Sequence, residues 1–180
     1  MRLYVFNTGS IQLEKGFITA GKDMSVMLEI PVPAFLITHP KGNVLFDTGV
    51  SRECIDDPDR RWGEVAKIFV PKVNKGQDIV SQLEALGYCP DDIDIVINSH
   101  LHLDHAGNNE CFPKARFLVQ RDEIGRLTGP RSFSGQHTSG RILTIRSTMW
   151  RSMVTTMSLM TGQYNAFRHP GIRRVISPSL

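Results

Sequence analysis

The sequence predicts an α/β fold, and three observations support this prediction. Short apolar runs at residues 34–39, 44–49 and 93–98 have the length and the β-branched and aromatic content that are typical of strands. Residues 77–86 carry apolar side chains at helical spacing and are followed by Gly87, a common residue just after a helix end. A group of metal-binding residue types follows the third run directly, where layered α/β proteins place their ligands.

The composition agrees with one globular domain of 180 residues, for which 41% hydrophobic and 22% charged residues are ordinary values. A net charge of +3 without a stripe of Lys or Arg argues against a nucleic-acid partner. No apolar run approaches the ~18 residues of a membrane span, and the start MRLYVFNTGSI is too weakly apolar for a signal peptide. Cys54, Cys89 and Cys111 are odd in number and widely spaced, so we expect a cytoplasmic protein with reduced thiols.

The N-terminal segment is predicted to begin with a short strand at residues 3–7. Gly9 and Ser10 are predicted to turn the chain after this strand. Residues 31–33, Pro-Val-Pro, then force an extended approach to the strand at residues 34–39.

A hairpin follows, because Pro-Lys-Gly-Asn at residues 40–43 predicts a tight turn within residues 35–47. Asp47 stands at the end of this hairpin. The residues alone leave open whether it is a functional group or a simple turn residue. Farther along the chain, residues 116–120 predict another strand and residues 121–123 the start of a helix.

The densest set of reactive side chains lies in residues 99–108, where His100, His102, Asp104 and His105 stand within six residues. Imidazole and carboxylate groups are ligands that suit zinc and neighbouring transition metals. His100 and His102 are two residues apart and point the same way on an extended backbone, an alternation that Asp104 continues. We therefore predict two adjacent ligand pairs for two ions, which can ionise a shared water at a spacing of about 3.5–4 Å.

The alternative to a metal site is a set of ordinary surface or core histidines. Three histidines and one aspartate in six residues, after an apolar strand, rarely arise without a metal, so we favour the metal site. Gly107 and Asn108 follow the motif and are predicted to permit a sharp turn after His105.

The pattern His-x-His-x-Asp-His resembles the signature of the metallo-β-lactamase superfamily. The longer strings INSHLHLDHAGNN and PVPAFLITHPKGNVLFDTG are similar to the N-acyl homoserine lactonase branch, whose members open the lactone ring of bacterial signal molecules. The resemblance covers about residues 1–123. It implies an αββα sandwich and a metal-dependent hydrolase of a small lactone or ester. It also implies two divalent ions, with Zn²⁺ as the first choice, although the ligand types also suit iron, manganese or cobalt.

The resemblance also implies roles for single residues. His100 and His102 would hold one ion, and Asp104 and His105 the second. Asp104 would also be catalytic, because in the family it handles the proton that passes between the bridging water and the product. Asp47 would be a supporting residue beneath the metal site.

The family places the region of residues 56–63 near its substrate entrance, so Trp62 is a candidate for lining that entrance. We favour the alternative that Trp62 is a half-buried tryptophan of a polar loop.

The resemblance breaks after Glu123. The family should next supply a third histidine for the first ion, a bridging aspartate, a last histidine and a tyrosine. This chain has only His137 and His169 there, outside the expected turns, and no aspartate after Asp122. We therefore predict that residues 1–123 are the N-terminal part of the sandwich and that residues 124–180 are an aberrant, poorly structured segment. Within that segment, four methionines at helical spacing are as consistent with a core stripe as with disorder: Met149, Met153, Met157 and Met160.

A shifted reading frame would explain the break. One possible coding sequence for residues 140–146 gives PDFDHP in a shifted frame, and one for residues 153–162 gives GDYDVFDDG in the same frame. Both strings look like lactonase segments in the right order. We favour a frameshift over true divergence and expect a truncated chain of little or no activity.

Two alternatives to lactone hydrolysis stay open: another hydrolase of this fold (a glyoxalase-type thioesterase, a β-lactamase or a phosphodiesterase), or a non-catalytic fragment.

Overall fold

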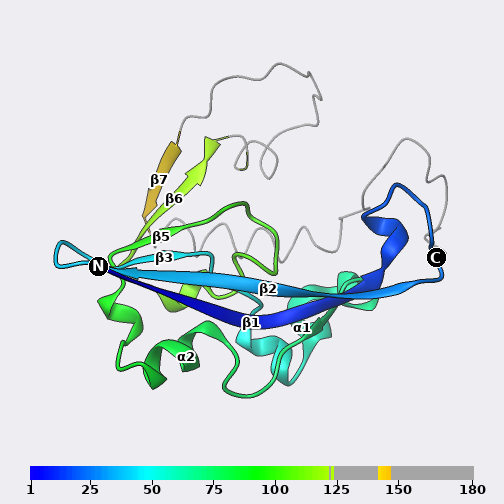
Figure 1. Ribbon diagram of the computed structural model, residues 1–180, viewed down its shortest axis with the longest axis horizontal. Coiled ribbons are helices and arrows are strands. Elements are labelled where there is room, and N and C mark those ends of the chain that lie inside the picture. The colour runs from blue at the N-terminus through cyan, green and yellow to red at the C-terminus, as the bar shows by residue number, and fades with distance from the viewer. Residues whose placement is uncertain (122, 124–141, 147–180) are drawn as a thin grey trace.

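The computed structural model describes residues 1–121, 123 and 142–146. These residues contain one mixed sheet of seven strands in the order β4-β1-β2-β3-β5-β6-β7 (Figure 1). The strands are β1 (Arg2–Glu14), β2 (Met27–Thr38), β3 (Val44–Phe46), β4 (Val70–Lys72), β5 (Ile95–Ile97), β6 (Arg116–Gln120) and β7 (Ile142–Arg146). The helices are α1 (Pro58–Trp62) and α2 (Ile79–Ala85), with short 3-10 turns at Lys15–Phe17, Arg52–Ile55, Gly63–Lys67, Pro90–Asp92 and Asn109–Cys111.

The centre of the sheet is parallel and its flanks are antiparallel. β3, β5 and β6 run parallel, whereas β1, β2 and β3 form an antiparallel meander and β7 pairs antiparallel with β6. A parallel pair needs a crossover connection, and α1 and α2 lie in the crossover between β3 and β5. The crossover from β5 to β6 contains the histidine motif, so the topology places the motif at the carboxyl ends of two parallel strands.

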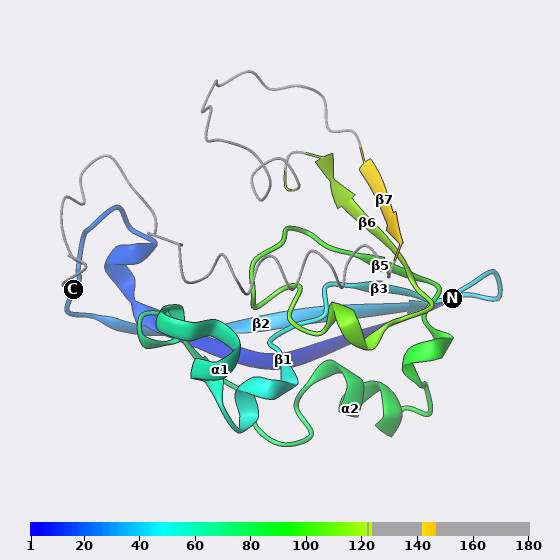
Figure 2. The ribbon, with the colours of Figure 1, turned by 180° about the vertical axis from the view of Figure 1, so that it is seen from behind.

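Both helices cover the same face of the sheet (Figures 1 and 2). Alternate residues of β2 point to this face: Val32 packs in a cluster with Trp62 of α1, and Leu36 packs in a cluster with Ile79 and Leu83 of α2. Asp78 caps α2, because its side chain accepts a hydrogen bond from the backbone N–H of Ser81. The buried core therefore lies between one helix layer and one face of the sheet.

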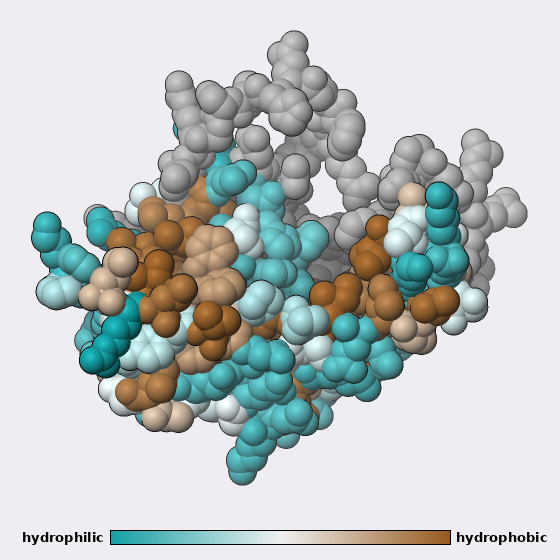
Figure 3. Space-filling view, viewed as in Figure 1, coloured by the Kyte–Doolittle hydropathy of each residue, from teal (hydrophilic) through white to brown (hydrophobic). Residues whose placement is uncertain are grey.

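The other face of the sheet is also apolar. Leu3 and Val5 on β1 remain 62% and 66% exposed, and they begin a ladder of apolar side chains across the sheet. Figure 3 shows part of the hydrophobic surface near the N-terminus. Strands that are apolar on both faces are typical of a sheet with a layer on each side, so the described residues form one helix layer and one sheet of the αββα sandwich. The ladder continues through Phe35, Ile37, Val44, Phe46, Ile95, Ile97 and Leu118.

The predicted turn at Gly9 and Ser10 is wrong, because β1 runs through both residues. The register with β2 shifts between Asn7 and Ser10, which marks a β-bulge. Gly9 has a φ of 122°, and a Cβ there would come within 2.8 Å of the Lys72 carbonyl oxygen in β4. The glycine therefore permits a bulge and a close strand contact, instead of ending the strand.

The predicted hairpin, the helix after Asp78, and the strands β5 and β6 are confirmed. β2 begins earlier than predicted, so Pro31 and Pro33 lie within it, opposite Ser10 and Asn7 at the bulge. Within the predicted polar loop, Asp57 caps the short helix α1. Trp62 at its end is only 2% exposed, so it is a core residue and not the half-buried loop residue that we favoured.

The segment after Glu123, which was predicted to be poorly structured, contains one described element, β7. The four methionines, His137 and His169 lie outside the described residues. The division of the chain at residue 123 therefore stays a prediction. No helix in the described part of the chain is long and apolar enough to cross a bilayer.

Candidate metal centre

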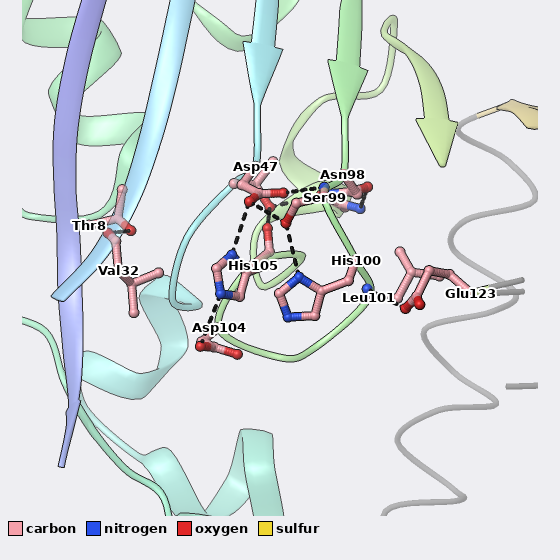
Figure 4. A network of polar contacts seen from close by, with 12 residues as sticks. Thr8, Val32, Asp47, Asn98, Ser99, His100, Leu101, Asp104, His105 and Glu123 are labelled. Atoms are coloured by element: carbon pink, nitrogen blue, oxygen red, sulfur yellow. Dashed lines mark hydrogen bonds and ion pairs between the residues drawn. The ribbon is translucent and has the colours of Figure 1, made fainter. Parts of the chain in front are cut away.

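Asp47 and Ser99 meet at the carboxyl edge of the sheet, just after β3 and β5 (Figure 4). These strands are parallel neighbours, and the backbone N–H of Asp47 donates to the carbonyl oxygen of Ile97 at 2.8 Å. Asp47 adopts a φ of 59°, a left-handed conformation that aspartate tolerates better than most residues. This sharp turn directs its carboxylate toward the histidine motif.

The Asp47 carboxylate is buried and has three polar partners. Oδ1 accepts from the backbone N–H of Ser99 at 2.8 Å, and Oδ2 accepts from the Ser99 hydroxyl at 2.7 Å. Oδ2 also lies 2.9 Å from Nδ1 of His105. Asp47 therefore fixes the orientation of the His105 ring, and directs Nε2 of that ring away from the sheet.

The three imidazole rings of the motif form a cluster. The ring centroid of His100 lies 4.4 Å from that of His102 and 4.2 Å from that of His105. Nε2 of His105 lies 3.4 Å from Oδ2 of Asp104. The carboxylate of Glu123 accepts a hydrogen bond from the backbone N–H of Leu101, between the first two histidines.

The backbone of the motif does not stay extended through Asp104. The N–H groups of His105 and Ala106 both donate to the carbonyl oxygen of His102, so residues 103–105 form a turn. The predicted alternation from His102 to Asp104 is therefore wrong. The turn brings the ring of His105 back to His100, a contact that an extended chain would not make.

The charges in the cluster depend on one another. Burial lowers the pKa of His105, but hydrogen bonds to Asp104 and Asp47 outweigh this effect and raise the pKa to about 9. Burial raises the pKa of Asp104, but its hydrogen bond and charge interaction with His105, a backbone hydrogen bond and the nearby His102 together outweigh this effect, so the net shift is downward. Burial and the neighbouring histidines His105 and His102 lower the pKa of His100. In the metal-free chain, His105 is thus a cation between two carboxylates.

The donor types fit a divalent ion, since imidazole and carboxylate are the usual ligands of zinc. His102 is exposed, and His100, Asp104 and His105 are partly exposed, so an ion can reach them. Within residues 1–121, 123 and 142–146, no three His, Cys, Asp or Glu side chains are placed to hold one ion together. A complete shell therefore requires ligands beyond those brought together here.

Sequence reasoning missed the residues that hold the motif in place. The chain turns at Gly107 and Asn108 as predicted, although the φ of Gly107 is not positive. Glycine is required at position 107 because a Cβ there would lie 2.5 Å from both the Gly49 carbonyl oxygen and the Ser51 nitrogen. Asn108 is buried and is not merely a turn residue. The separations in sequence are too long for any local pattern to reveal these contacts.

We expect the stability of the metal-free chain to fall between pH 6.5 and 9. The pKa of His105 is raised from 6.5 to about 9 in the folded state, so its stabilising contribution is complete below pH 6.5 and is lost as the pH rises through 9. The lowered pKa of His100 acts below pH 6.5, outside this window. Denaturant unfolding with a chelator at several pH values measures the slope.

The matched variants for this measurement are Asp47→Asn and Asp91→Asn. Asp47 contacts His105, whereas Asp91 forms an exposed ion pair with Lys114 at 2.8 Å. Asp47→Asn should flatten the slope and Asp91→Asn should retain it. An unchanged slope in Asp47→Asn would contradict the assignment of the pH dependence to this contact.

Comparison with known proteins finds metallo-β-lactamase superfamily members and N-acyl homoserine lactonases. A family model described as the metallo-β-lactamase superfamily matches residues 28–137, which include both the hairpin and the histidine motif. Among curated proteins, the N-acyl homoserine lactonase AttM of Agrobacterium fabrum is 39% identical over 135 residues, covering 75% of this chain and 51% of AttM. The lactonase AiiB of the same organism is 35% identical, covering 79% and 54%. The chain thus spans about half the length of the curated relatives it matches.

Solved structures show the same similarity. An N-acyl homoserine lactone hydrolase with N-hexanoyl-L-homoserine bound at its catalytic metal centre is 29% identical, with a TM-score of 0.64 over 73% of this chain and 53% of that one. A Bacillus thuringiensis AiiA variant with N-decanoyl-L-homoserine in its active site is 29% identical, with a TM-score of 0.63 and the same coverage.

Proposed function

The chain belongs to the metallo-β-lactamase superfamily, and from this premise we propose that it derives from a metal-dependent hydrolase that opens N-acyl homoserine lactones. The observation that carries the proposal is the joint position of the histidine motif and Asp47 at the carboxyl edge of β3 and β5. The identity to curated lactonases over the same residues supports this substrate class.

In the proposed site, His100 and His102 would hold one divalent ion, and Asp104 and His105 would hold the second. Such ions would supply Lewis-acid chemistry, which acidifies water and stabilises negative charge on a carbonyl oxygen. Asp47 accepts a hydrogen bond from Nδ1–H of His105, so the neutral ring would present the lone pair of Nε2 to an ion. Asp104 is the proposed catalytic residue, because its partly exposed carboxylate is suited to carry a proton between the water and the product.

For the chain as it stands, the proposal is weak activity or none. The support is the absence of any aspartate after Asp122, where the family expects a bridging one. A frameshift after Glu123 is the explanation we favour, and a truly divergent segment is the alternative. The partner is a small lactone or ester, with neither nucleic acid nor membrane. A cytoplasmic location is proposed because all three cysteines are unpaired: Cys54, Cys89 and Cys111.

A substrate panel tests the proposed chemistry. The protein read in the shifted frame after Glu123 is loaded with zinc and given an acyl homoserine lactone, a glutathione thioester, a β-lactam and a phosphodiester. We expect the lactone to be turned over fastest and the turnover to stop with a chelator. Preference for another substrate would point to a different hydrolase of this fold. Metal binding without any turnover would favour the non-catalytic alternative.

A further inference from the structure

Two loops at the candidate metal centre touch each other without space between them. We define the Asp47 loop as residues 47–52 and the motif loop as residues 99–109. The backbone N–H of Gly107 donates to the Gly49 carbonyl oxygen at 3.0 Å, and that of Thr48 donates to the His105 carbonyl oxygen at 2.8 Å. A Cβ on Gly107 would lie 2.5 Å from both the Gly49 carbonyl oxygen and the Ser51 nitrogen, so the two backbones lie in direct contact.

Asn108 is the residue that joins these loops most completely, and it is 1% exposed. Its Nδ2 group donates to the carbonyl oxygens of Thr48 and Val50, both at 2.7 Å. Its Oδ1 atom accepts from the backbone N–H of Arg52 at 2.8 Å, and its own N–H donates to the Thr48 hydroxyl at 3.2 Å. All four hydrogen bonds therefore end in the Asp47 loop.

Asn108 lies close in sequence to His105, and its hydrogen-bond partners lie close to Asp47. His105 lies three residues before Asn108, and Asp47 lies one residue before Thr48. The bonds of Asn108 thus fix the separation of the two loops on which Asp47 and His105 stand, and with it their 2.9 Å contact. Resting on the proposed function, we propose that Asn108 is a positioning residue that holds the His105 ring in the orientation required to ligate metal.

The chemistry of the amide explains why asparagine is required. Asn108→Asp keeps the acceptor for Arg52 but turns a second oxygen toward the carbonyl oxygens of Thr48 and Val50, and these acceptors repel one another. Asn108→Ala removes the partner of two buried carbonyl groups and of the partly buried Arg52 N–H. Buried groups without partners are costly, so both changes should separate the loops.

The first test uses NMR of the full chain without metal. The Nδ1 proton of His105, held by Asp47, should give a slowly exchanging low-field resonance that disappears in His105→Gln. We expect Asn108→Asp and Asn108→Ala to lose this resonance. The matched control is Asn43→Ala, because Asn43 also joins two segments, donating to the Asp92 carbonyl oxygen at 2.9 Å, but at the opposite end of β3. The control should keep the resonance.

The second test measures Co²⁺ affinity and the Co²⁺ absorption spectrum. Changes in residues that orient ligands typically weaken metal binding about 10–100-fold, and we expect a loss of this size in both Asn108 variants. Asn43→Ala should stay within about twofold of the parent, as for a change that touches no ligand support. Folded Asn108 variants with the resonance and the affinity of the parent would overturn the proposal.

A third pair of variants guards against an Asn108 variant that does not fold. Compared with Arg52→Ala, Arg52→Pro also removes the backbone N–H that donates to Asn108 Oδ1. Proline fits here because residue 52 begins a 3-10 turn after Ser51 in an extended conformation. Arg52→Ala keeps that N–H. We expect Arg52→Pro to lower the Co²⁺ affinity about 2- to 12-fold below Arg52→Ala, the effect of one net hydrogen bond. Equal affinities and equal His105 resonances in the two would overturn the proposal.

These readouts separate this proposal from the proposed function. A chain that opens no lactone can still show the His105 resonance and its loss in the Asn108 variants, which would support the positioning role and contradict the lactonase. A parent without the resonance would overturn the positioning role, whatever the substrate panel shows.

Discussion

Read in the shifted frame after Glu123, the protein should open acyl homoserine lactones more than about 100-fold faster than the chain as it stands. The reason is the coordination shell: partners outside the shell are already worth about 10–100-fold, and missing ligands should cost more. Initial rates of ring opening, at equal zinc and protein concentrations, measure the difference.

Within the restored protein, Asp104→Asn should remove this gain in ring-opening rate, because an amide cannot carry the proton and lacks the negative charge with which the carboxylate would bind the ion. Asp91→Asn should keep it, since Asp91 is an exposed residue paired with Lys114. Turnover by the unrepaired chain that scales with its concentration and stops on chelation would defeat this prediction.

Loss of metal binding in His102→Ala is the second large effect we expect. The unaltered chain should bind a divalent ion weakly, because much of the expected shell is missing. The His102 side chain is exposed, and its ring lies edge-to-face against His100 with the ring centroids 4.4 Å apart. Its removal should therefore cost little stability. If His102 is a ligand, however, its removal should lower the zinc affinity below the measurable range, because the site already lacks other ligands.

The matched control is His39→Ala, because His39 is also exposed but lies between β2 and β3, away from the motif. Zinc competition against a chromophoric chelator measures the affinity, and thermal unfolding with a chelator shows that both variants remain folded. Tight binding of two ions by the unaltered chain would show that further ligands exist and that the truncation hypothesis is wrong. Equal zinc affinity in His102→Ala and His39→Ala would exclude His102 as a ligand.

The sequence alone predicted five of the seven described strands, in whole or in part, together with the second helix and the candidate ligands. These features are local: short apolar runs indicate strands, helical spacing indicates α2, and four candidate ligands within six residues indicate a metal site. The sheet edge that carries the motif was also predictable, because a polar motif directly followed a buried strand.

Predictions from local sequence patterns were wrong where two different local structures fit the same pattern. A glycine in an apolar run is equally consistent with a turn and with a bulge, and only the pairing of β1 with β2 and β4 selects the bulge at Gly9. Likewise, the polar residues around Trp62 suggested a loop, but packing on Val32 from a distant strand buries the tryptophan.

The contacts that support the candidate site became visible in the fold, although the family resemblance had already implied a supporting role for Asp47. Asp47 reaches His105 across 58 residues of chain, and Asn108 reaches Thr48 across 60. No periodicity or motif spans such separations, because these contacts arise from the parallel pairing of β3 and β5, which brings two loop starts to the same edge. The sequence therefore named the side chains that are suited to hold metal. The fold decided which of them meet, how His105 is oriented, and that Asn108 joins the two loops.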